Sequence, residues 1–413
     1  MAAGRSQLIT ALDIGTTKVC CFIARAESEQ SLRVIGIGHQ VSKGLRAGTV
    51  VDMEATEESI RAAVEAAERM AGETVREVHV ALAGGRPHSH TVGVEVSIAG
   101  HAIGDSDLRR VLEQGRPAPD ETGEREVIHS LPVGFTVDGA SGVRDPRGMY
   151  GSRLGVNIHV VTANTGPMRN LSLCVARGHL QVASVTVAPY ASGLATLVED
   201  EMRLGVTLVD MGGGTTTIAV FKDGELIFVD GLAVGGIHIT QDIARGLATP
   251  MNHAERMKTL FGSALPSPAD ERELIDVPVI GETDRDITNQ VPRSVLVGIV
   301  RPRAEEIFEL VRNRLEAAGM DRIAGRRVVL TGGGSQLQGA RELAARMLDK
   351  QVRLGRPIRM DGLAEATGGP AFATCAGLLG LALREPPAAV RDFVDSSDSG
   401  RISRFGRWLR TNF

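Results

Sequence analysis

The chain has 413 residues, 43% of them hydrophobic, which is typical of a globular protein with more than one domain. Its 46 Lys and Arg residues against 50 Asp and Glu residues leave a net charge of −4, which argues against a nucleic-acid partner. The first residues lack a signal-peptide pattern and the four cysteines form no Cys-x-x-Cys pair, so we expect free thiols in a reducing compartment.

A strand, a tight turn and a second strand are predicted between Leu8 and Ile23, followed by a short strand at Arg33–Gly38. The candidate site residues of this first hairpin are Asp13, Gly15, Thr16, Thr17 and Lys18. Glycine lets backbone N–H groups converge on an anion without a side chain in the way. A carboxylate at the end of a strand can hold a hydrated Mg²⁺.

The next elements indicate an α/β core with a small module inserted into it. Apolar residues recur on one face of a long helix expected at Met53–Ala71, and a buried strand is expected at Val78–Ala83. Between residues 86 and 157 the pattern changes. Strands are expected there at Thr91–Ile98 and Glu126–Val137, with a short helix near Ser106–Gln114, and we interpret this range as an inserted α+β subdomain.

The hairpin design is repeated in the middle of the chain, at Val206–Phe221. Two core strands (Ile158–Ala163 and Gln181–Val187) and a helix from about Tyr190 to Met202 precede it, and a strand at Glu225–Val229 follows. Its candidate site residues are Asp210, Gly212, Gly213, Gly214 and Thr215. Taken alone, such a stretch is also compatible with an ordinary glycine-rich turn. Two copies predict two related half-domains that face each other across a nucleotide.

The second half of the chain adds further candidate pieces of a nucleotide site. Gly235 and Gly236 lead into a helix, and Glu255 and Lys258 share one face of the next helix, at Asn252–Leu260. A solvated ion pair is the alternative for these two residues. A third glycine-rich turn (Gly332, Gly333, Gly334 and Ser335) follows a strand that begins at Arg327. The helix expected after this turn would offer its N-terminus to phosphate or ribose oxygens.

Three longer elements complete the globular part. Ser263–Arg293 is predicted to be loop-rich with short strands, Arg303–Ala318 an amphipathic helix, and Ala371–Leu383 a core helix.

The last residues form a different kind of segment. Residues 385–399 are rich in Pro, Ser and Asp and predict a flexible linker. In residues 400–413 a helical period separates bulky apolar side chains from four arginines, which is typical of a helix lying in a membrane interface. The apolar set is Ile402, Phe405, Trp408, Leu409 and Phe413, and the basic set is Arg401, Arg404, Arg407 and Arg410. The alternatives are a helix docked on the protein's own surface and a peptide bound in a partner's groove.

The three glycine-rich turns, in this order, resemble the phosphate-1, phosphate-2 and adenosine segments of the actin, Hsp70 and sugar-kinase superfamily. With the Glu255/Lys258 helix, the inserted range and the Arg/Trp tail, the whole chain resembles the FtsA family, the actin-like cell-division proteins of bacteria. The resemblance implies an α/β, actin-like two-lobed ATPase fold of duplicated ribonuclease-H-like halves. An inserted small α+β subdomain and a C-terminal amphipathic helix would complete it.

The resemblance also divides the chain. The first-lobe core would be residues 1–85 and 158–198, and the inserted subdomain 86–157. The second-lobe core would be residues 199–235 and 301–384, and its small subdomain 236–300. The linker at 385–399 and the membrane helix at 400–413 would follow.

ATP and Mg²⁺ are the cofactors that the resemblance implies. Asp13 and Asp210 would organise the Mg²⁺ through water molecules, while the turns at Gly15–Thr17 and Gly212–Thr215 would wrap the β- and γ-phosphates. Lys18 would add a positive charge to the phosphates. Glu255 and Lys258 would contact the ribose and base, and Gly332–Ser335 would cover the adenosine.

The resemblance further implies a polymer at the cytoplasmic face of the bacterial inner membrane, at the division septum. The expected partners are the C-terminal peptide of FtsZ, other copies of the chain, anionic inner-membrane lipid and other division proteins. The FtsZ peptide would bind the small subdomain of the second lobe. Candidate contacts for this acidic peptide are Arg285, Arg293 and Arg301.

Hydrolysis of ATP is expected to be slow or undetectable. It needs a group that orients or deprotonates the attacking water, and no Asp or Glu occurs from Pro146 through Val198. Asn164 or Thr165 would position a water there but would be poor bases. A sugar or acetate kinase of the same superfamily and an actin-like pilus-assembly ATPase are the alternative functions, and neither explains the Arg/Trp tail.

Overall fold

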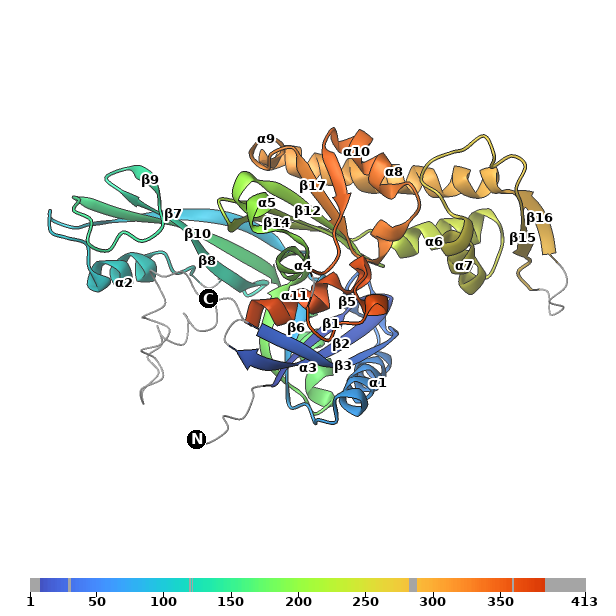
Figure 1. The fold of residues 1–413 in the computed structure, drawn as a ribbon, viewed down its shortest axis with the longest axis horizontal. Helices are drawn as coiled ribbons and strands as arrows, with labels where there is room; N and C mark the ends of the chain where they lie inside the picture. Colours follow the sequence, from blue (N-terminus) through green and yellow to red (C-terminus); the bar gives the residue numbers. More distant parts are fainter. Residues whose placement is uncertain are drawn as a thin grey trace.

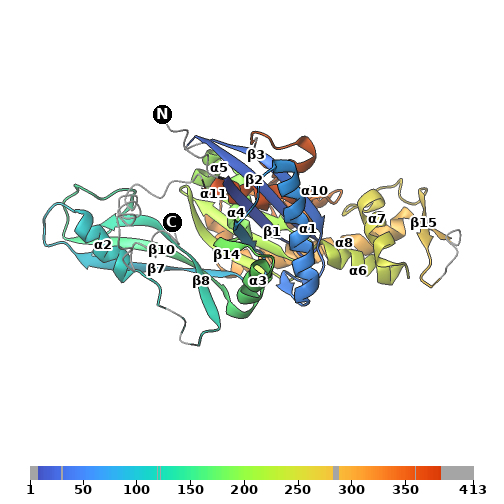
Figure 2. The same ribbon diagram turned by 90° about the horizontal axis from the view of Figure 1, so that it is seen from below.

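The computed structural model describes residues 8–28, 31–118, 120, 122–281, 288–358 and 360–382, and the structural statements below concern these residues. The predicted linker and membrane helix lie outside them, as does Arg285. Two lobes form the body of the molecule, and a smaller part projects from it at each end (Figures 1 and 2).

The two lobes are built on the same strand arrangement. In the first lobe, β1 (Leu8–Ile14), β2 (Lys18–Ser28) and β3 (Ser31–Val41) are antiparallel, while β6 (Glu77–Leu82) and β11 (Gln181–Val187) run parallel to β1. The sheet order is β11-β6-β1-β2-β3. In the second lobe the corresponding order is β18-β17-β12-β13-β14, with the same directions. The predicted duplication of one half-domain is confirmed.

The second-lobe strands are β12 (Val206–Met211), β13 (Thr216–Lys222), β14 (Glu225–Leu232), β17 (Arg327–Thr331) and β18 (Gln351–Leu354). Every residue of β12 is buried, because helices cover both faces of the sheet. The central strand that carries Asp210 is therefore held rigidly in the core.

Helix α1 (Met53–Ala71) has the predicted bounds and covers the first-lobe sheet. The Asp52 side chain accepts a hydrogen bond from the backbone N–H of Ala55 at 3.1 Å and caps its start, and Gly72 ends it in the left-handed conformation (φ 68°). A side chain at Gly38 of β3 would overlap the Ala63 carbonyl of α1. The helix can therefore pack closely on the sheet only because glycine stands there.

The inserted subdomain consists of β7 (His88–Ser97), α2 (Asp105–Gln114), β8 (Arg125–Val137), β9 (Ala140–Val143) and β10 (Arg153–Asn164). It has its own core, in which Leu108 and Leu112 of α2 pack with strand residues such as Phe135 and Ile158. Its strands extend the second-lobe sheet to nine strands through the pairing of His88 with Asp230. The predicted insertion is confirmed as a structural unit.

The small part of the second lobe lies at the opposite end of the molecule from the inserted subdomain (Figures 1 and 2). It contains α6 (Gly236–Gly246), α7 (Met251–Phe261), β15 (Leu274–Pro278) and β16 (Thr288–Pro292). Helix α8 (Arg293–Ala317) leads from it to α9 (Met320–Ile323) and α10 (Ala340–Leu348).

Two predicted helix bounds were wrong. The helix expected at Arg303–Ala318 begins at Arg293. Pro302 has no backbone N–H to donate within the helix, but the burial of Leu296, Val297 and Val300 stabilises the turns that precede it. The division placed between residues 300 and 301 consequently falls inside α8, and the domain bounds stay a prediction.

The single helix expected from Tyr190 to Met202 is two helices, α4 (Ala188–Thr196) and α5 (Glu199–Leu204). Leu197 between them adopts an extended backbone (φ −95°, ψ 141°), which buries its side chain. The other helices are α3 (Thr165–Arg177) and α11 (Ala373–Ala382), and none of the helices within the described ranges is long and apolar enough to cross a membrane. All four cysteines are free, as predicted, and the structure also buries them.

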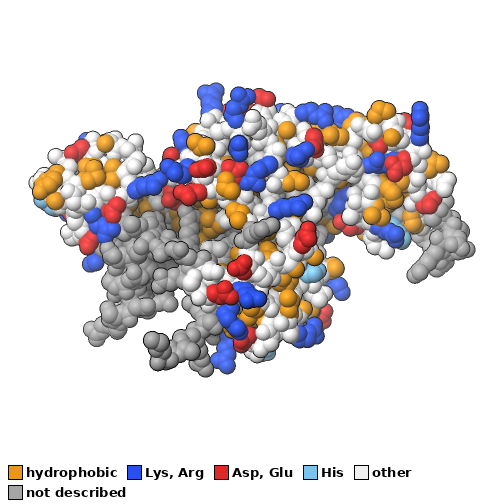
Figure 3. Space-filling model, in the orientation of Figure 1, with side chains coloured by type: hydrophobic (Ala, Val, Ile, Leu, Met, Phe, Trp, Pro, Cys, Tyr) orange, Lys and Arg blue, Asp and Glu red, His pale blue; other side chains and the backbone are white. Residues whose placement is uncertain are grey.

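Basic and acidic side chains are interspersed over one broad face of the molecule (Figure 3). Several ion pairs of the described residues join neighbouring turns of one helix, such as Arg301 with Glu305 of α8. Pairs of this kind add little to stability, so the fold depends on its buried cores.

Candidate functional site

The turns of the two related hairpins lie against each other between the lobes. Each turn is closed by the same backbone bond, from Gly15 N to Lys18 O at 2.9 Å in the first and from Gly212 N to Thr215 O at 2.8 Å in the second. Added side chains at Gly213 and Gly214 would overlap Thr17 and Thr16, respectively. The structure therefore brings both predicted phosphate turns together, with threonines of one packed on glycines of the other.

Asp13 and Asp210 stand at the bases of these turns. Burial raises the pKa of Asp13 to about 6, with Lys18 opposing the shift and the charge of Asp210 adding to it. Burial also raises the pKa of Asp210, while hydrogen bonds from Ser192 and Thr374 and the charge of Lys18 act in the opposite direction. The two carboxylates thus influence each other within one buried site.

The residues at this site fit Mg²⁺. Two buried carboxylates that disfavour each other's charge would be relieved by a divalent cation, and Mg²⁺ commonly takes one or two carboxylates and keeps several waters. No cluster of three or more His, Cys, Asp or Glu side chains suited to a metal occurs in the described part of the chain. The donor set matches a largely hydrated ion better than a metal enclosed by protein ligands.

Side chains from two helices position Asp210. Its Oδ2 accepts hydrogen bonds from the hydroxyl groups of Ser192 on α4 and Thr374 on α11, the latter at 3.2 Å. The two hydroxyl groups also lie 3.0 Å apart, so they form one small network. Sequence reasoning missed both residues, because neither lies in a motif and each reaches Asp210 only through the fold.

The segment that precedes α11 contacts the first hairpin and the third glycine-rich turn. Lys18 donates a hydrogen bond to the Ala371 carbonyl, and its Nζ lies 3.5 Å from the centre of the Phe372 ring. The Pro370 carbonyl accepts a hydrogen bond from Gly332 N at 3.2 Å. The predicted phosphate lysine is therefore held by this segment in the structure described here.

The third glycine-rich turn packs directly on the second hairpin. Gly332 has a left-handed backbone (φ 83°), and a side chain there would overlap the Asp210 carboxylate and the Met211 carbonyl. The Ser335 hydroxyl donates to the Gly332 carbonyl at 2.7 Å. A 3₁₀ turn at Gly333–Gln336 precedes α10, so the helix expected after this glycine-rich turn begins at Ala340.

The start of α6 joins the Glu255/Lys258 pair to the turns. The backbone N–H groups of Gly236 and Ile237 donate to the carbonyls of Gly212 and Gly213 at 3.0 and 2.7 Å. The Lys258 ammonium donates to the Gly236 carbonyl at 3.1 Å and to Glu255 at 2.7 Å. The structure thus brings three predicted pieces to one side of Asp210. These are the Glu255/Lys258 pair, the glycines Gly235 and Gly236, and the third glycine-rich turn.

The two candidate peptide arginines that lie within the described residues, Arg293 and Arg301, are both paired with acidic side chains. Arg293 is held by Asp270, Glu273, Gln338 and the Phe261 carbonyl, at 2.8 to 3.2 Å. Arg301 pairs with Glu305 at 2.7 Å. These contacts do not support the expectation that Arg293 is open to a peptide, because four of its five N–H donors are already used.

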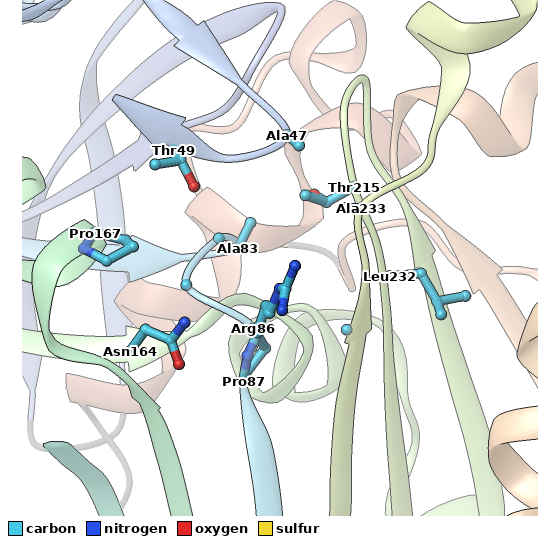
Figure 4. A pocket seen from close by; sticks show the side chains of 13 residues that line it. Ala47, Thr49, Ala83, Arg86, Pro87, Asn164, Pro167, Thr215, Leu232 and Ala233 are labelled. Carbon is cyan, nitrogen blue, oxygen red and sulfur yellow. The ribbon is translucent and has the colours of Figure 1, made fainter. Parts of the chain in front are cut away.

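A cavity of about 340 Å³ lies between the lobes beside the second hairpin turn (Figure 4). Asn164 and Thr215 are among its lining residues, whereas Thr165 is buried and donates its hydroxyl hydrogen to the Gly123 carbonyl at 2.9 Å. Of the two residues predicted to position a water, only Asn164 therefore faces this space.

The sequence matches known cell-division proteins over its whole length. The family model described as "Cell division protein FtsA" matches residues 207–377, and the one described as "SHS2 domain inserted in FTSA" matches residues 84–162. The "Cell division protein FtsA" of Rhizobium meliloti (strain 1021) is 46% identical over 99% of this chain and 96% of the relative. The protein of the same name from Pseudomonas aeruginosa (strain PAO1) is 35% identical over 98% of each chain.

Solved structures of low sequence identity share the fold. A "PilM-PilN type IV pilus biogenesis complex" chain aligns with a TM-score of 0.62 and 18% identity, covering 91% of this chain and 98% of that chain. MreB5 of Spiroplasma citri bound to ADP aligns with a TM-score of 0.53 and 14% identity, covering 90% and 95%. These likenesses confirm the predicted actin-like two-lobed fold. The full-length relatives at 35–46% identity show that this chain belongs to the FtsA family of cell-division proteins.

Proposed function

We propose that the chain is an ATP-binding, actin-like division protein that polymerises at the inner membrane and tethers FtsZ there. The observation that carries the nucleotide part is the convergence of the three glycine-rich turns around Asp13 and Asp210. The similarity in fold to an ADP-bound protein supports the same inference.

In this proposal the described residues divide the work of holding the nucleotide. The backbone N–H groups of the two hairpin turns bind the phosphates, and Asp13 and Asp210 fix the position of the cation. Mg²⁺, when bound, would neutralise the charge of the β- and γ-phosphates. Glu255, Lys258 and the turn at Gly332–Ser335 would bind the ribose and base. The contacts of Lys258 with Gly236 already hold its ammonium group at that side of the site.

In this proposal the chain hydrolyses ATP slowly. The residues that line the cavity beside Thr215 include no Asp or Glu among those described, so no carboxylate there can accept a proton from an attacking water. The same absence weakens the kinase alternative, which would need a base for the hydroxyl of its acceptor.

Membrane attachment and FtsZ binding rest on the sequence and the family. The Arg/Trp tail at residues 400–413 would bind anionic lipid, with each Arg contributing about 1 kcal/mol near the leaflet. The small part of the second lobe would bind the FtsZ C-terminal peptide, and other copies of the chain would add to a filament. The protein would then lie on the cytoplasmic face of the inner membrane at the septum.

Co-sedimentation with vesicles tests this proposal. The full chain and a chain that ends at Ser399 are each mixed with anionic or uncharged vesicles, with and without Mg-ATP. We expect pelleting that needs residues 400–413 and anionic lipid and that increases with Mg-ATP. Recruitment of FtsZ to the pelleted vesicles is the next measurement. Equal pelleting of the two chains would contradict the membrane assignment, and a full chain indifferent to Mg-ATP would contradict the nucleotide-dependent polymer.

A further inference from the structure

Helix α4 lies between the strands of the two lobes, at the centre of the molecule (Figures 1 and 2). All of its residues except Leu194 are buried. From the middle of this helix, Ser192 donates its hydroxyl hydrogen to the carboxylate of Asp210. The bond that holds Asp210 therefore depends on how the start of α4 is fixed in place.

The start of α4 is held by a side chain of the inserted subdomain. Val187, the residue that caps the helix, donates its backbone N–H to the Nε2 atom of His129 on β8 at 3.1 Å. In many helices a Glu or Gln three positions after the cap residue accepts a hydrogen bond from this N–H. Tyr190 occupies that position in α4, and His129 supplies the acceptor instead. The helix is thus capped from another subdomain.

The His129 ring can accept this hydrogen bond only in its neutral form. The His129 side chain is buried, and so is Val187. Burial, followed by the charge of the neighbouring His159, lowers the pKa of His129 to about 3. At neutral pH the ring is therefore uncharged, with its proton on Nδ1 and an acceptor at Nε2.

The same ring also contacts the second lobe through Tyr190. His129 packs edge-on against Tyr190 with the ring centres 5.4 Å apart, and Tyr190 stacks on Phe221 of β13 at 6.2 Å. A side chain at Gly193 would overlap the Phe221 ring, so α4 and β13 are in close contact. Close packing of this kind passes a displacement of α4 on to its neighbours.

We propose that His129 is a positioning residue for the cation site, because it fixes the start of α4 and thereby the Ser192 hydroxyl that holds Asp210. This inference rests on the proposed binding of a nucleotide with Mg²⁺. It links the inserted subdomain to the nucleotide site, since β8 belongs to the first and α4 reaches the second. Coupling of this kind is reciprocal, so a displacement of β8 changes nucleotide affinity and nucleotide binding changes the position of β8.

A double-mutant cycle between His129 and Ser192 tests the link without nucleotide. Urea unfolding is measured for the original chain, His129→Leu, Ser192→Ala and the double variant. The two side chains bond different partners, so independent effects on the unfolding midpoint would add. We expect the midpoint shift of the double variant to be smaller than the sum of the two single shifts, because either substitution loosens the same helix. Additive shifts would overturn the proposal.

Titration with a fluorescent ATP analogue, with and without Mg²⁺, measures the effect on the site itself. His129→Leu should weaken Mg-dependent binding about fivefold in the original chain and less than about twofold when Ser192 is already alanine. His129→Gln carries an amide oxygen near the place of Nε2 and should restore most of the affinity. The matched control is His159→Leu, which removes a buried histidine of the neighbouring strand β10. The Nδ1 atom of His159 lies 3.5 Å from the Thr91 hydroxyl of the same subdomain.

A second variant keeps the test open if His129→Leu does not fold. His129→Asn then takes its place in both measurements, because the shorter amide does not reach the Val187 N–H. The proposal is overturned if the variant binds the Mg-bound analogue as tightly as His159→Leu does, or if its loss of affinity is the same in the Ser192→Ala background. A folded original chain without Mg-dependent binding would contradict the proposed function instead, and the unfolding cycle would still decide the link between His129 and Ser192.

Discussion

The two hydroxyl groups that hold Asp210 offer a sharp test of how the fold builds the site. Asp210 is 7% exposed and accepts hydrogen bonds from Ser192 and Thr374, which lie on different helices. A hydrogen bond to a charged group contributes about 1.5–3 kcal/mol. We therefore expect Ser192→Ala and Thr374→Val each to lower the free energy of unfolding by about 2 kcal/mol. Because the two hydroxyl groups also contact each other, the double variant should depart from additivity by about 1 kcal/mol.

The same substitutions should weaken Mg-dependent nucleotide binding. Both hydroxyl groups lower the pKa of Asp210, so removing either one favours the protonated carboxyl and opposes cation binding. A loss of about 1.4 kcal/mol would weaken binding about tenfold. The assays are urea unfolding and titration with a fluorescent ATP analogue, each with and without Mg²⁺.

Thr367→Val is the matched control for these variants. Thr367 is also a buried threonine, but its hydroxyl donates to the Ala364 carbonyl at 3.1 Å and does not contact Asp210. It should cost some stability and leave nucleotide affinity unchanged. The reasoning is refuted if Ser192→Ala and Thr374→Val reduce Mg-dependent affinity no more than Thr367→Val does.

Three further predictions concern pH, a glycine and the ribose side. Burial and the nearby charge of His90 lower the pKa of His159 to about 4, so the unfolded chain binds more protons between about pH 4 and pH 6.5. Protonation of His159 in the unfolded chain should therefore lower the free energy of unfolding by about 3 kcal/mol as the pH falls through that range. Urea unfolding of His159→Leu over the same range should not show this decrease. Gly332→Ala should lower stability by at least about 2 kcal/mol and abolish nucleotide binding, measured by unfolding and titration, because its side chain would overlap Asp210. Lys258→Met should weaken ATP binding about tenfold in titrations while leaving the Mg²⁺ dependence intact, because it removes only the contacts on the side of Gly236. A pH profile of His159→Leu that matches the original chain, or unchanged ATP affinity in Lys258→Met, would contradict the corresponding argument.

The sequence predicted the parts of the fold whose signals are local. The two hairpins are each specified by an apolar strand, an aspartate and a glycine turn within a few residues, and both are confirmed. The bounds of α1 follow from the Asp52 cap and Gly72. Where distant packing decides, local patterns failed: Leu197 interrupts a helix to reach the core, and α8 continues past Pro302.

The residues of the candidate site also fall into two groups, those with a local sequence signal and those without one. The glycine turns and the two aspartates carry their own sequence signal, and the fold brings them together. Ser192, Thr374 and Phe372 carry none, because an isolated hydroxyl or aromatic residue in a helix is compatible with many environments. The contact of Thr374 with Asp210 and the contact of Phe372 with Lys18 each join residues that lie more than 150 positions apart in the sequence. Only the folded chain reveals such contacts.

Binding of ATP with and without Mg²⁺ tests the central claim most directly. The original chain, Asp13→Asn, Asp210→Asn and the peripheral control Asp52→Asn are titrated with the same fluorescent ATP analogue, and folding is checked for each by unfolding. We predict Mg-dependent binding in the original chain and the control, with loss of the Mg²⁺ dependence in both site variants. Equal, Mg-independent affinity in all four folded chains would contradict a nucleotide site built around Asp13 and Asp210.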